Sequence, residues 1–252
     1  MDKQPVFFCV CSQKGGVGKS TFTILLANWL HYALGRDVLV VDCDAPQWSI
    51  VAQRERELDV LERNDRYKLM MVRLFKRTGR KIWPVVRSTP YEGLQAARAY
   101  FAAGDREADF VRLDLPGTVA APGIFRLLAQ LDHLFIPLKA DKLVLESALS
   151  FARAVDEQLV HNDALRLKGL HLFWTMVDRR ERTPLYESYG QAFAAFRLPV
   201  LQTQVPYRSR FSKEILDTSG AVGRSTLFPA DRAFAADAAL DALAAEILSL
   251  ME

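Results

Sequence analysis

The chain has 252 residues, of which 50% are hydrophobic and 25% are charged, and its formal net charge is +3. A charge this small does not by itself indicate a nucleic-acid partner, and three cysteines without a matching second pair do not indicate a zinc site. The start of the chain lacks a basic region followed by an apolar stretch, and no apolar run approaches the roughly 18 residues of a membrane span, so we expect a cytoplasmic protein.

The first predicted strand, Val6–Cys11, leads into the sequence Ser-Gln-Lys-Gly-Gly-Val-Gly-Lys-Ser-Thr at residues 12–21. An apolar helix is expected over 21–34, where Gly35 ends it. Glycines in such a loop let successive backbone N–H groups point at a phosphate chain, and the start of the helix adds the positive end of its dipole. The segment therefore predicts a nucleotide phosphate site.

Two side chains of this loop suit phosphate and metal chemistry. Lys19 supplies a positive charge for the β- and γ-phosphates, and the Ser20 hydroxyl can ligate Mg²⁺. The ordinary P-loop pattern has glycine where this chain has Gln13, and a second lysine, Lys14, stands next to it. The predicted cofactor-binding residues of the loop are Gly15, Gly16, Val17, Gly18, Lys19, Ser20 and Thr21.

Acids follow two further predicted strands. Val38–Val41 is followed by Asp42 and Asp44, and Phe110–Leu113 is followed by Asp114. Ligands of α/β sheets gather at the carboxyl ends of strands, so one acid of the first pair can serve Mg²⁺ and the other can orient an attacking water. The alternative for that pair is an Asx-type turn that closes the strand. Asp114 has the usual position of a Walker-B acid.

The same region holds two residues of special kind. Gly117 permits a backbone N–H to approach a γ-phosphate. Arg112, inside a predicted strand, requires a sheet edge or a charged partner.

The remaining pattern alternates strands and helices, which predicts a single α/β domain over 1–252. Its sheet is expected to be mostly parallel, with about seven strands and helices on both faces. Further strands are expected at Trp83–Val86, His133–Pro137, Leu170–Thr175 and Val200–Gln204. Further helices are expected at 48–64, 66–77, 91–103, 122–131, 141–160, 184–196 and 231–251.

Two other features of the pattern carry expectations. The stretch 51–82 is rich in Lys and Arg and is expected to form a basic segment of two helices. Cys9, Cys11 and Cys43 lie in or beside predicted central strands, where we expect them in the core.

Four motifs occur in order along the chain: Lys14-Gly-Gly-Val-Gly-Lys-Ser-Thr21, Asp42-x-Asp44, Asp114-x-Pro-Gly117 and Thr175-Met-Val-Asp178. Together they resemble the deviant Walker-A ATPases of the ParA/MinD superfamily, nearer to the ParA branch. Residues 42–47 and 54–57 are most similar to the ParA-type TraA proteins of conjugative transposons. The resemblance covers roughly residues 5–215 and implies a P-loop NTPase fold in which two subunits hold ATP and Mg²⁺ between them.

The resemblance also implies roles for single residues. Lys14 reaches the phosphates of the partner's ATP, Thr21 contacts the α-phosphate, and Asp44 positions the hydrolytic water. The catalytic residues are then Lys14, Lys19 and Asp44, and the metal residues are Ser20, Asp42 and Asp114. Gly117 and three adenine-pocket residues, Met176, Asp178 and Pro206, complete the cofactor site. Ala45, inserted before Pro46, departs from the ParA pattern and leaves the roles of Pro46 and Gln47 open.

The superfamily contains DNA-binding and membrane-binding branches. No Lys or Arg follows Arg232, and the acids in residues 237–252 disfavour an anionic membrane. Arg208, Arg210 and Lys213 lie where ParA-like proteins place residues for non-specific DNA. The expected partners are a second copy of the chain, non-specific DNA and a ParB-like or transfer-machinery protein that stimulates hydrolysis, and no membrane.

The leading hypothesis is an ATP-driven dimerising switch that binds DNA and hydrolyses ATP slowly. Its work would be partitioning or positioning of a mobile element, plasmid or transfer machinery. The alternatives are a metabolic ATP-dependent enzyme such as a dethiobiotin synthetase, a MinD-like positioning ATPase, and a scaffold that binds nucleotide without turnover. An electron donor of the nitrogenase-reductase kind would need cysteines on exposed loops for its cluster.

Overall fold

The computed structural model describes residues 4–104, 107–117, 122–178, 180, 183–215 and 222–252. Within these residues, six strands form one fully parallel sheet in the order β3-β2-β4-β1-β5-β6. The strands are β1 Val6–Val10, β2 Val38–Asp42, β3 Val85–Arg87, β4 Phe110–Asp114, β5 His133–Leu138 and β6 Gly169–Trp174. The predicted P-loop NTPase-type fold is confirmed, with six strands in place of about seven.

The helices follow the expected pattern closely. They are α1 Lys19–Asn28, α2 Ser49–Arg63, α3 Asp65–Thr78, α4 Gly93–Ala102, α5 Pro122–Leu128, α6 Lys142–Val155, α7 Leu185–Ala195, α8 Arg232–Asp237 and α9 Leu240–Met251. Helices α1 and α6 each continue into a π-helical turn, Trp29–Ala33 and Asp156–Val160. The two helices expected within 51–82 are confirmed as α2 and α3.

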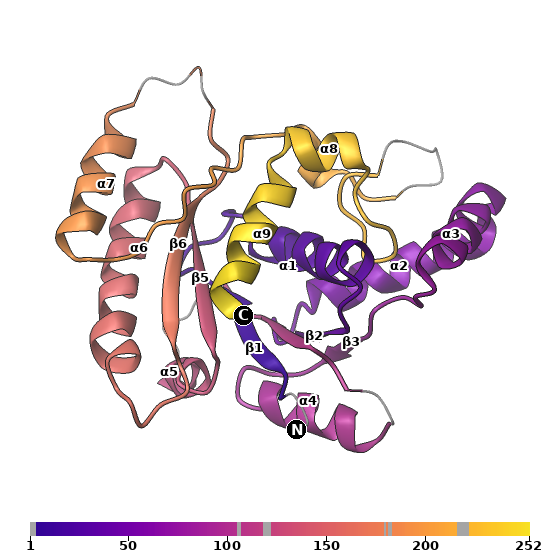
Figure 1. Ribbon diagram of the computed structural model, residues 1–252, viewed down its shortest axis with the longest axis horizontal. Helices are drawn as coiled ribbons and strands as arrows, with labels where there is room; N and C mark the ends of the chain where they lie inside the picture. Colours follow the sequence, from indigo (N-terminus) through magenta and orange to yellow (C-terminus); the bar gives the residue numbers. More distant parts are fainter. Residues whose placement is uncertain (1–3, 105–106, 118–121, 179, 181–182, 216–221) are drawn as a thin grey trace.

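The sheet lies between two helical layers (Figure 1). Helices α4, α5, α6 and α7 pack on one face, and α1, α8 and α9 pack on the other. Each helical layer encloses a hydrophobic core with the sheet, and alternate strand residues point into the two cores. Phe7 and Cys9 of β1 face the core under α4–α7, and Phe8 and Val10 face the core under α1, α8 and α9. Because both faces are covered, the strands are continuously apolar, as in other parallel sheets.

The prediction of a strand at Val200–Gln204 is wrong. Only Val200 forms a bridge, with Leu172 of β6. The backbone N–H groups of Gln202 and Thr203 instead donate to the two carboxylate oxygens of Glu246 in α9, at 2.7 and 2.9 Å. The side chain of a packed helix thus takes the donors that a neighbouring strand would have used.

The prediction of one continuous helix over 231–251 is also wrong. The chain turns at Ala239, whose φ of 54° is left-handed, and α8 and α9 are separate. Both helices nevertheless bury apolar side chains in the same core, including Phe234 and Leu243. Alanine favours helix wherever packing allows it, so the sequence carried no signal for this turn.

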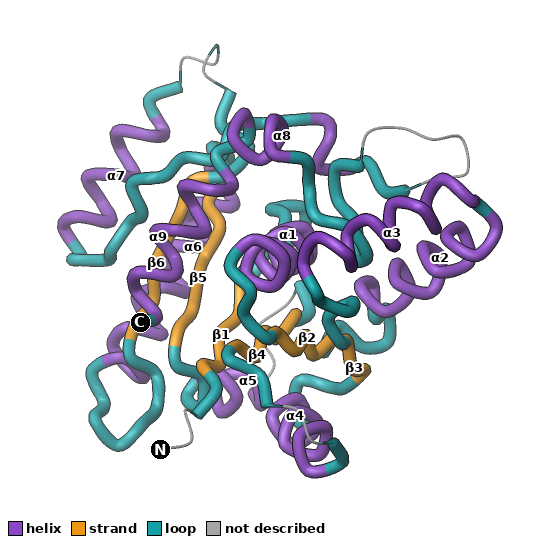
Figure 2. Tube along the Cα trace, turned by 45° about the vertical axis from the view of Figure 1, so that its right-hand side comes forward, coloured by secondary structure: helices purple, strands orange, loops and turns teal. Residues whose placement is uncertain are grey.

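The hairpin of α2 and α3 projects from the side of the molecule opposite α6 and α7 (Figures 1 and 2). Tyr67 and Leu74 of α3 form a small core of their own with Ile215, Leu227 and Phe228. The hairpin is therefore anchored on a C-terminal segment, residues 214–228, of which 216–221 lie outside the described residues.

Of the two settings expected for Arg112, a sheet edge or a charged partner, the structure rules out the sheet edge. It is fully buried in β4, between β1 and β2, and its guanidinium lies 5.0 Å from the ring centre of Phe8. None of its three side-chain nitrogens has a hydrogen-bond partner among the described residues. Burial lowers the pKa of Arg112 to about 9.

Candidate functional site

The loop between β1 and α1 has the backbone of a phosphate cradle. Gly16 and Gly18 have φ angles of 75° and 91°, which residues with a side chain rarely adopt. Gln13, the residue that departs from the ordinary pattern, accepts a hydrogen bond from the hydroxyl of Ser147 in α6, at 2.9 Å. The departure therefore fixes the loop to a neighbouring helix.

The two lysines of the loop lie in different surroundings. Lys19 points across the loop, and its Nζ donates to the backbone carbonyl of Lys14 at 3.2 Å. A Cβ added at Gly117 would lie 3.7 Å from that Nζ, so Gly117 and Lys19 face the same space. The side chain of Lys14 is exposed, and within the described part of the chain no acid pairs with it.

Asp114 is the buried centre of a hydrogen-bond cluster. One carboxylate oxygen accepts from the hydroxyl of Ser20 at 2.7 Å, and the other accepts from Thr23 at 2.9 Å. Burial raises the pKa of Asp114 to about 6, although these two hydrogen bonds act in the opposite direction. Thr23 was missed by sequence reasoning, yet its position three residues after Ser20 in a helix places it on the same side.

Replacing Asp114 with asparagine is expected to stabilise the nucleotide-free protein at pH 8 but not at pH 4. Because the folded pKa is above the unfolded value, the folded state binds more protons between about pH 4 and 6, and stability falls as pH rises through that window. Asparagine does not titrate, so the variant avoids this loss of about 3 kcal/mol. The measurement is the difference in Tm between variant and wild type at both pH values. A difference independent of pH would contradict the prediction.

Asp42 lies beside Asp114, since the two residues are paired in the register of β2 and β4. Its Oδ2 accepts from the backbone N–H groups of Ile50 and Val51, each at 3.0 Å, and its Oδ1 accepts from the N–H of Asp44 at 3.2 Å. Asp42 therefore holds the N-terminus of α2, a structural task that the sequence did not reveal. Its pKa is raised by burial, against these three hydrogen bonds.

Asp44 borders an open cavity of about 620 Å³ at the carboxyl ends of β1, β2 and β4. Burial first, and then the charge of Asp42, raise the pKa of Asp44, whereas Lys19 lowers it. The residues that line the cavity are Gly15, Gly16, Gly18, Lys19, Ser20, Thr21, Asp44, Ala45, Gln47, Ser49, Pro116, Gly117 and Arg224. The structure thus gathers most of the predicted loop residues with Asp44 and Gly117 around one space.

The turn after Asp44 has its own form. The Ala45–Pro46 peptide bond is cis, and the carbonyl of Asp44 accepts from the N–H groups of Gln47 and Trp48, each at 2.8 Å. Gln47 faces the cavity, whereas Pro46 is exposed and is not part of its lining.

Backbone hydrogen bonds join the two segments that contain the predicted adenine-pocket residues Met176, Asp178 and Pro206. The N–H of Val177 donates to the carbonyl of Val205, and the N–H of Tyr207 donates to the carbonyl of Val177, each at 3.0 Å. Met176 before them is left-handed, with a φ of 54°. Asp178 forms an exposed ion pair with Arg180 at 2.9 Å, and hydrogen bonds from Arg180 lower the pKa of Asp178 to about 2.

The three predicted DNA-binding residues are not equally free. Arg208 forms an ion pair with Asp237 at the end of α8, and Arg210 pairs with Asp231 just before α8. Lys213 is exposed, and no acid within the described residues pairs with it. Two of the three cations therefore already neutralise acids within the chain.

Arg224 is a cavity residue that sequence reasoning missed. Its Nη1 donates to the hydroxyl of Thr21 at 3.0 Å, across 203 positions of sequence. No local motif could have connected the two, because only the folded C-terminal segment brings them together.

Residues 8–221 match the family model described as the CobQ/CobB/MinD/ParA nucleotide binding domain. The chain belongs to this family. The chain is also similar to the chromosome-partitioning ATPase Soj of Treponema pallidum, with 30% identity over 230 residues, covering 80% of this chain and 83% of Soj.

Solved structures show the same fold. A plasmid partition protein from Borrelia burgdorferi superposes with a TM-score of 0.54 and 20% identity, covering 82% of this chain and 91% of that protein. The structure of pNOB8 ParA bound to nonspecific DNA superposes with a TM-score of 0.51 and 17% identity, covering 79% of each chain. Among the residues that the structure of this chain describes, no helix is long and apolar enough to cross a membrane.

Proposed function

We propose that this protein is a ParA-like ATPase that dimerises with ATP, binds DNA non-specifically and releases it after slow hydrolysis. The observation that carries the proposal is the cavity that joins the glycine loop, Lys19, Ser20 and Asp44. A Soj relative that covers most of the chain supports the same activity class. Non-specific DNA as the working surface implies a cytoplasmic place of action.

The residues around the cavity fit a Mg²⁺-nucleotide. Gly16 and Gly18 have positive φ angles, and backbone N–H groups in such a loop can point together at an anion. Lys19 supplies a cation on the same side as Gly117. Ser20 offers an oxygen ligand whose proton is held by Asp114. Mg²⁺ takes most of its ligands from phosphates and water, so one hydroxyl with supporting carboxylates is sufficient. A bound Mg²⁺ would neutralise part of the negative charge of the phosphates.

The proposed chemistry assigns a task to each of three side chains. Asp44 accepts a hydrogen bond from the attacking water and orients it. Lys19 holds the phosphate chain inside its own subunit. Lys14, exposed and outside the cavity lining, contributes its charge to the nucleotide of the partner subunit.

DNA is favoured over a membrane by the packing of α9. Leu243 and Ile247 of this helix are buried against the sheet. Its acids are engaged as well: Asp241 accepts from Trp29, and Glu246 accepts from the N–H groups of residues 202 and 203. An apolar face committed to the core cannot also insert into lipid.

An electron donor of the nitrogenase-reductase kind would need exposed cysteine ligands for its cluster, and the cysteines of this chain do not meet that need. All three cysteines of the chain, Cys9, Cys11 and Cys43, are fully buried, so none reaches a surface where two subunits could share a cluster. Similarity of residues 42–47 and 54–57 to TraA proteins suggests a mobile element or its transfer machinery as cargo, with a ParB-like protein as stimulator.

The deciding experiment measures molecular size and DNA retention in the same sample, with ADP and with a non-hydrolysable ATP analogue. A dimer that retains DNA of unrelated sequences only with the analogue supports the proposal. A monomer in both states, or retention that ignores the nucleotide, contradicts it and favours a metabolic enzyme.

The combined variant Arg208→Gln, Arg210→Gln, Lys213→Gln is expected to weaken DNA retention and to lower its salt dependence by about two or three counterions. Because Arg208 and Arg210 also hold α8, the matched control is Asp231→Asn with Asp237→Asn. That control breaks the same ion pairs but frees the arginines, so it should strengthen retention. Equal weakening by both variants would indicate that α8, not the cations, matters.

A further inference from the structure

We propose that Arg224 is a phosphate-binding residue of the nucleotide site, on the α-phosphate side, and that its ion pair with Glu214 competes with the nucleotide for it. This inference rests on the proposed function and assigns a residue that lies outside the loop motifs. It begins from position, since Arg224 lines the cavity although it stands about 200 residues after the glycine loop.

The contact with Thr21 sets the side of the cavity. Arg224 Nη1 donates to Thr21 Oγ1 at 3.0 Å, which occupies that oxygen as an acceptor and leaves the hydroxyl proton free to be donated elsewhere. A phosphate oxygen that takes this proton lies within reach of the guanidinium as well. By resemblance Thr21 serves the α-phosphate, so Arg224 should act on ADP and ATP alike.

The guanidinium has donors to spare. Its Nε is buried and has no hydrogen-bond partner within the described residues, and only Nη1 and Nη2 are engaged. Five donors in a planar fork suit phosphate oxygens better than a lysine does. A second cation beside Lys19 also matches the high negative charge of a nucleotide.

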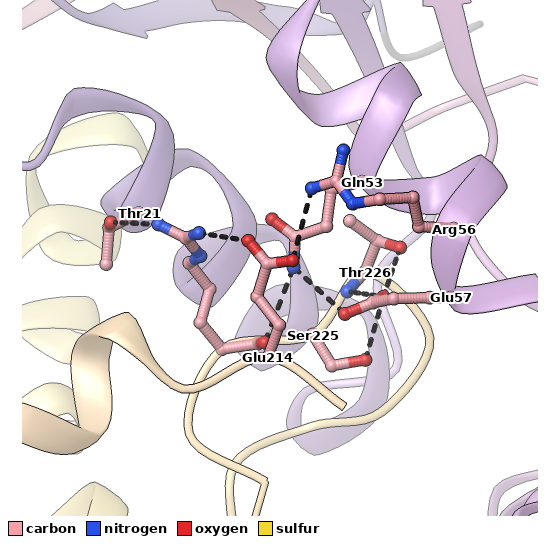
Figure 3. A network of polar contacts seen from close by, with 8 residues as sticks. Thr21, Gln53, Arg56, Glu57, Glu214, Ser225 and Thr226 are labelled. Atoms are coloured by element: carbon pink, nitrogen blue, oxygen red, sulfur yellow. Dashed lines mark hydrogen bonds and ion pairs between the residues drawn. The ribbon is translucent and has the colours of Figure 1, made fainter. Parts of the chain in front are cut away.

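The backbone of Arg224 is held firmly, which fixes where its side chain can reach. Figure 3 shows Gln53, Arg56 and Glu57 of α2 facing Glu214, Ser225 and Thr226 of the C-terminal segment. Glu57, only 1% exposed, accepts from the hydroxyls of Ser225 and Thr226 and from the N–H of Thr226. The residues that follow Arg224 are thus tied to α2.

Glu214 is the competitor. It accepts from Arg224 Nη2 through one carboxylate oxygen and pairs with Arg56 of α2 through the other, at 3.1 Å. Both partners of the Arg224–Glu214 pair are 22% exposed, so the pair is screened only in part. When a phosphate binds Arg224 in place of Glu214, Glu214 keeps only its ion pair with Arg56 of α2. Nucleotide binding thereby changes the ion pairing of the α2–α3 hairpin.

The test is equilibrium binding of fluorescent ADP and of a fluorescent non-hydrolysable ATP analogue, each with Mg²⁺. Arg224→Gln should weaken both by about tenfold, and Arg224→Lys should weaken them less. Glu214→Gln should tighten both, because it removes the competitor. The matched control is Arg80→Gln: Arg80 is 20% exposed and pairs with Asp37, before the amino end of β2, where it lines a separate cavity of about 910 Å³.

The outcomes separate this inference from the proposed function. Unchanged affinity in Arg224→Gln, with binding lost in Lys19→Ala, overturns the role of Arg224 alone. Unchanged affinity in both overturns the nucleotide site itself. A loss confined to the ATP analogue contradicts the α-phosphate side, and weaker binding by Glu214→Gln contradicts the competition. If Arg224→Gln does not fold, Arg224→Lys and Glu214→Gln carry the same test.

Discussion

Replacing Lys14 with alanine is expected to lower ATP turnover by at least about a thousandfold while Mg-ATP still binds. The side chain of Lys14 is exposed and does not line the cavity, so its loss removes no contact from the cradle of its own subunit. The backbone carbonyl that accepts a hydrogen bond from Lys19 is still present in the alanine variant. The lost interaction is with charge that develops during phosphoryl transfer in the partner subunit. Turnover and nucleotide affinity are measured separately. Lys168→Ala, an exposed lysine before β6, is the control.

A mixture of two inactive variants tests whether Lys14 acts across the dimer. In a mixed dimer of Lys14→Ala and Asp44→Ala subunits, the site in the Lys14→Ala subunit has its own Asp44 and receives the partner's Lys14. The other site lacks both. Mixing should therefore restore about a quarter of wild-type turnover, since half of the dimers are mixed and each has one complete site. If Lys14 acts within its own subunit, the mixture stays inactive.

The parts of the site that follow local rules could be predicted from sequence. Gly16 and Gly18 were needed for their backbone, and both have positive φ angles. Asp42 and Asp114 are the last residues of two apolar strands, and parallel strands bring their carboxyl ends to one edge, where these two acids are paired in register.

The parts that depend on distant packing could not be predicted. Arg224 reaches Thr21 only because Glu57, Ser225 and Thr226 fix the segment around it. Glu246 of α9 accepts hydrogen bonds from the N–H groups of Gln202 and Thr203, so these groups do not pair with a neighbouring strand. Neither event leaves a periodicity or motif in the sequence.

The burial of polar groups was also beyond local rules. Arg112 was expected at a sheet edge or beside a charged partner. Strand order places it in the middle of the sheet, and strand order is a property of the whole topology. Asp42 was expected to serve a metal, and two of the three backbone hydrogen bonds that it accepts depend on where α2 begins.

Replacing Asp44 with alanine is expected to stop turnover after ATP has bound and the dimer has formed. Asp44 is half-buried beside the cavity and makes no side-chain hydrogen bond to the glycine loop within the described residues, so its loss should spare nucleotide binding. A subunit that binds ATP but cannot orient the water remains in the ATP state. The variant should therefore accumulate as a dimer with Mg-ATP and return to monomer with ADP.

The measurement is size-exclusion chromatography with light scattering, alongside phosphate release. Turnover should fall by at least about a hundredfold. Asp59→Ala, which removes an exposed acid of α2, is the control and should behave as wild type. The raised pKa of Asp44 adds a second signature: because a base must be deprotonated, wild-type turnover should decline on the acid side at a higher pH than an ordinary aspartate would give. A variant that stays monomeric with Mg-ATP, or keeps half of its turnover, would remove Asp44 from the mechanism.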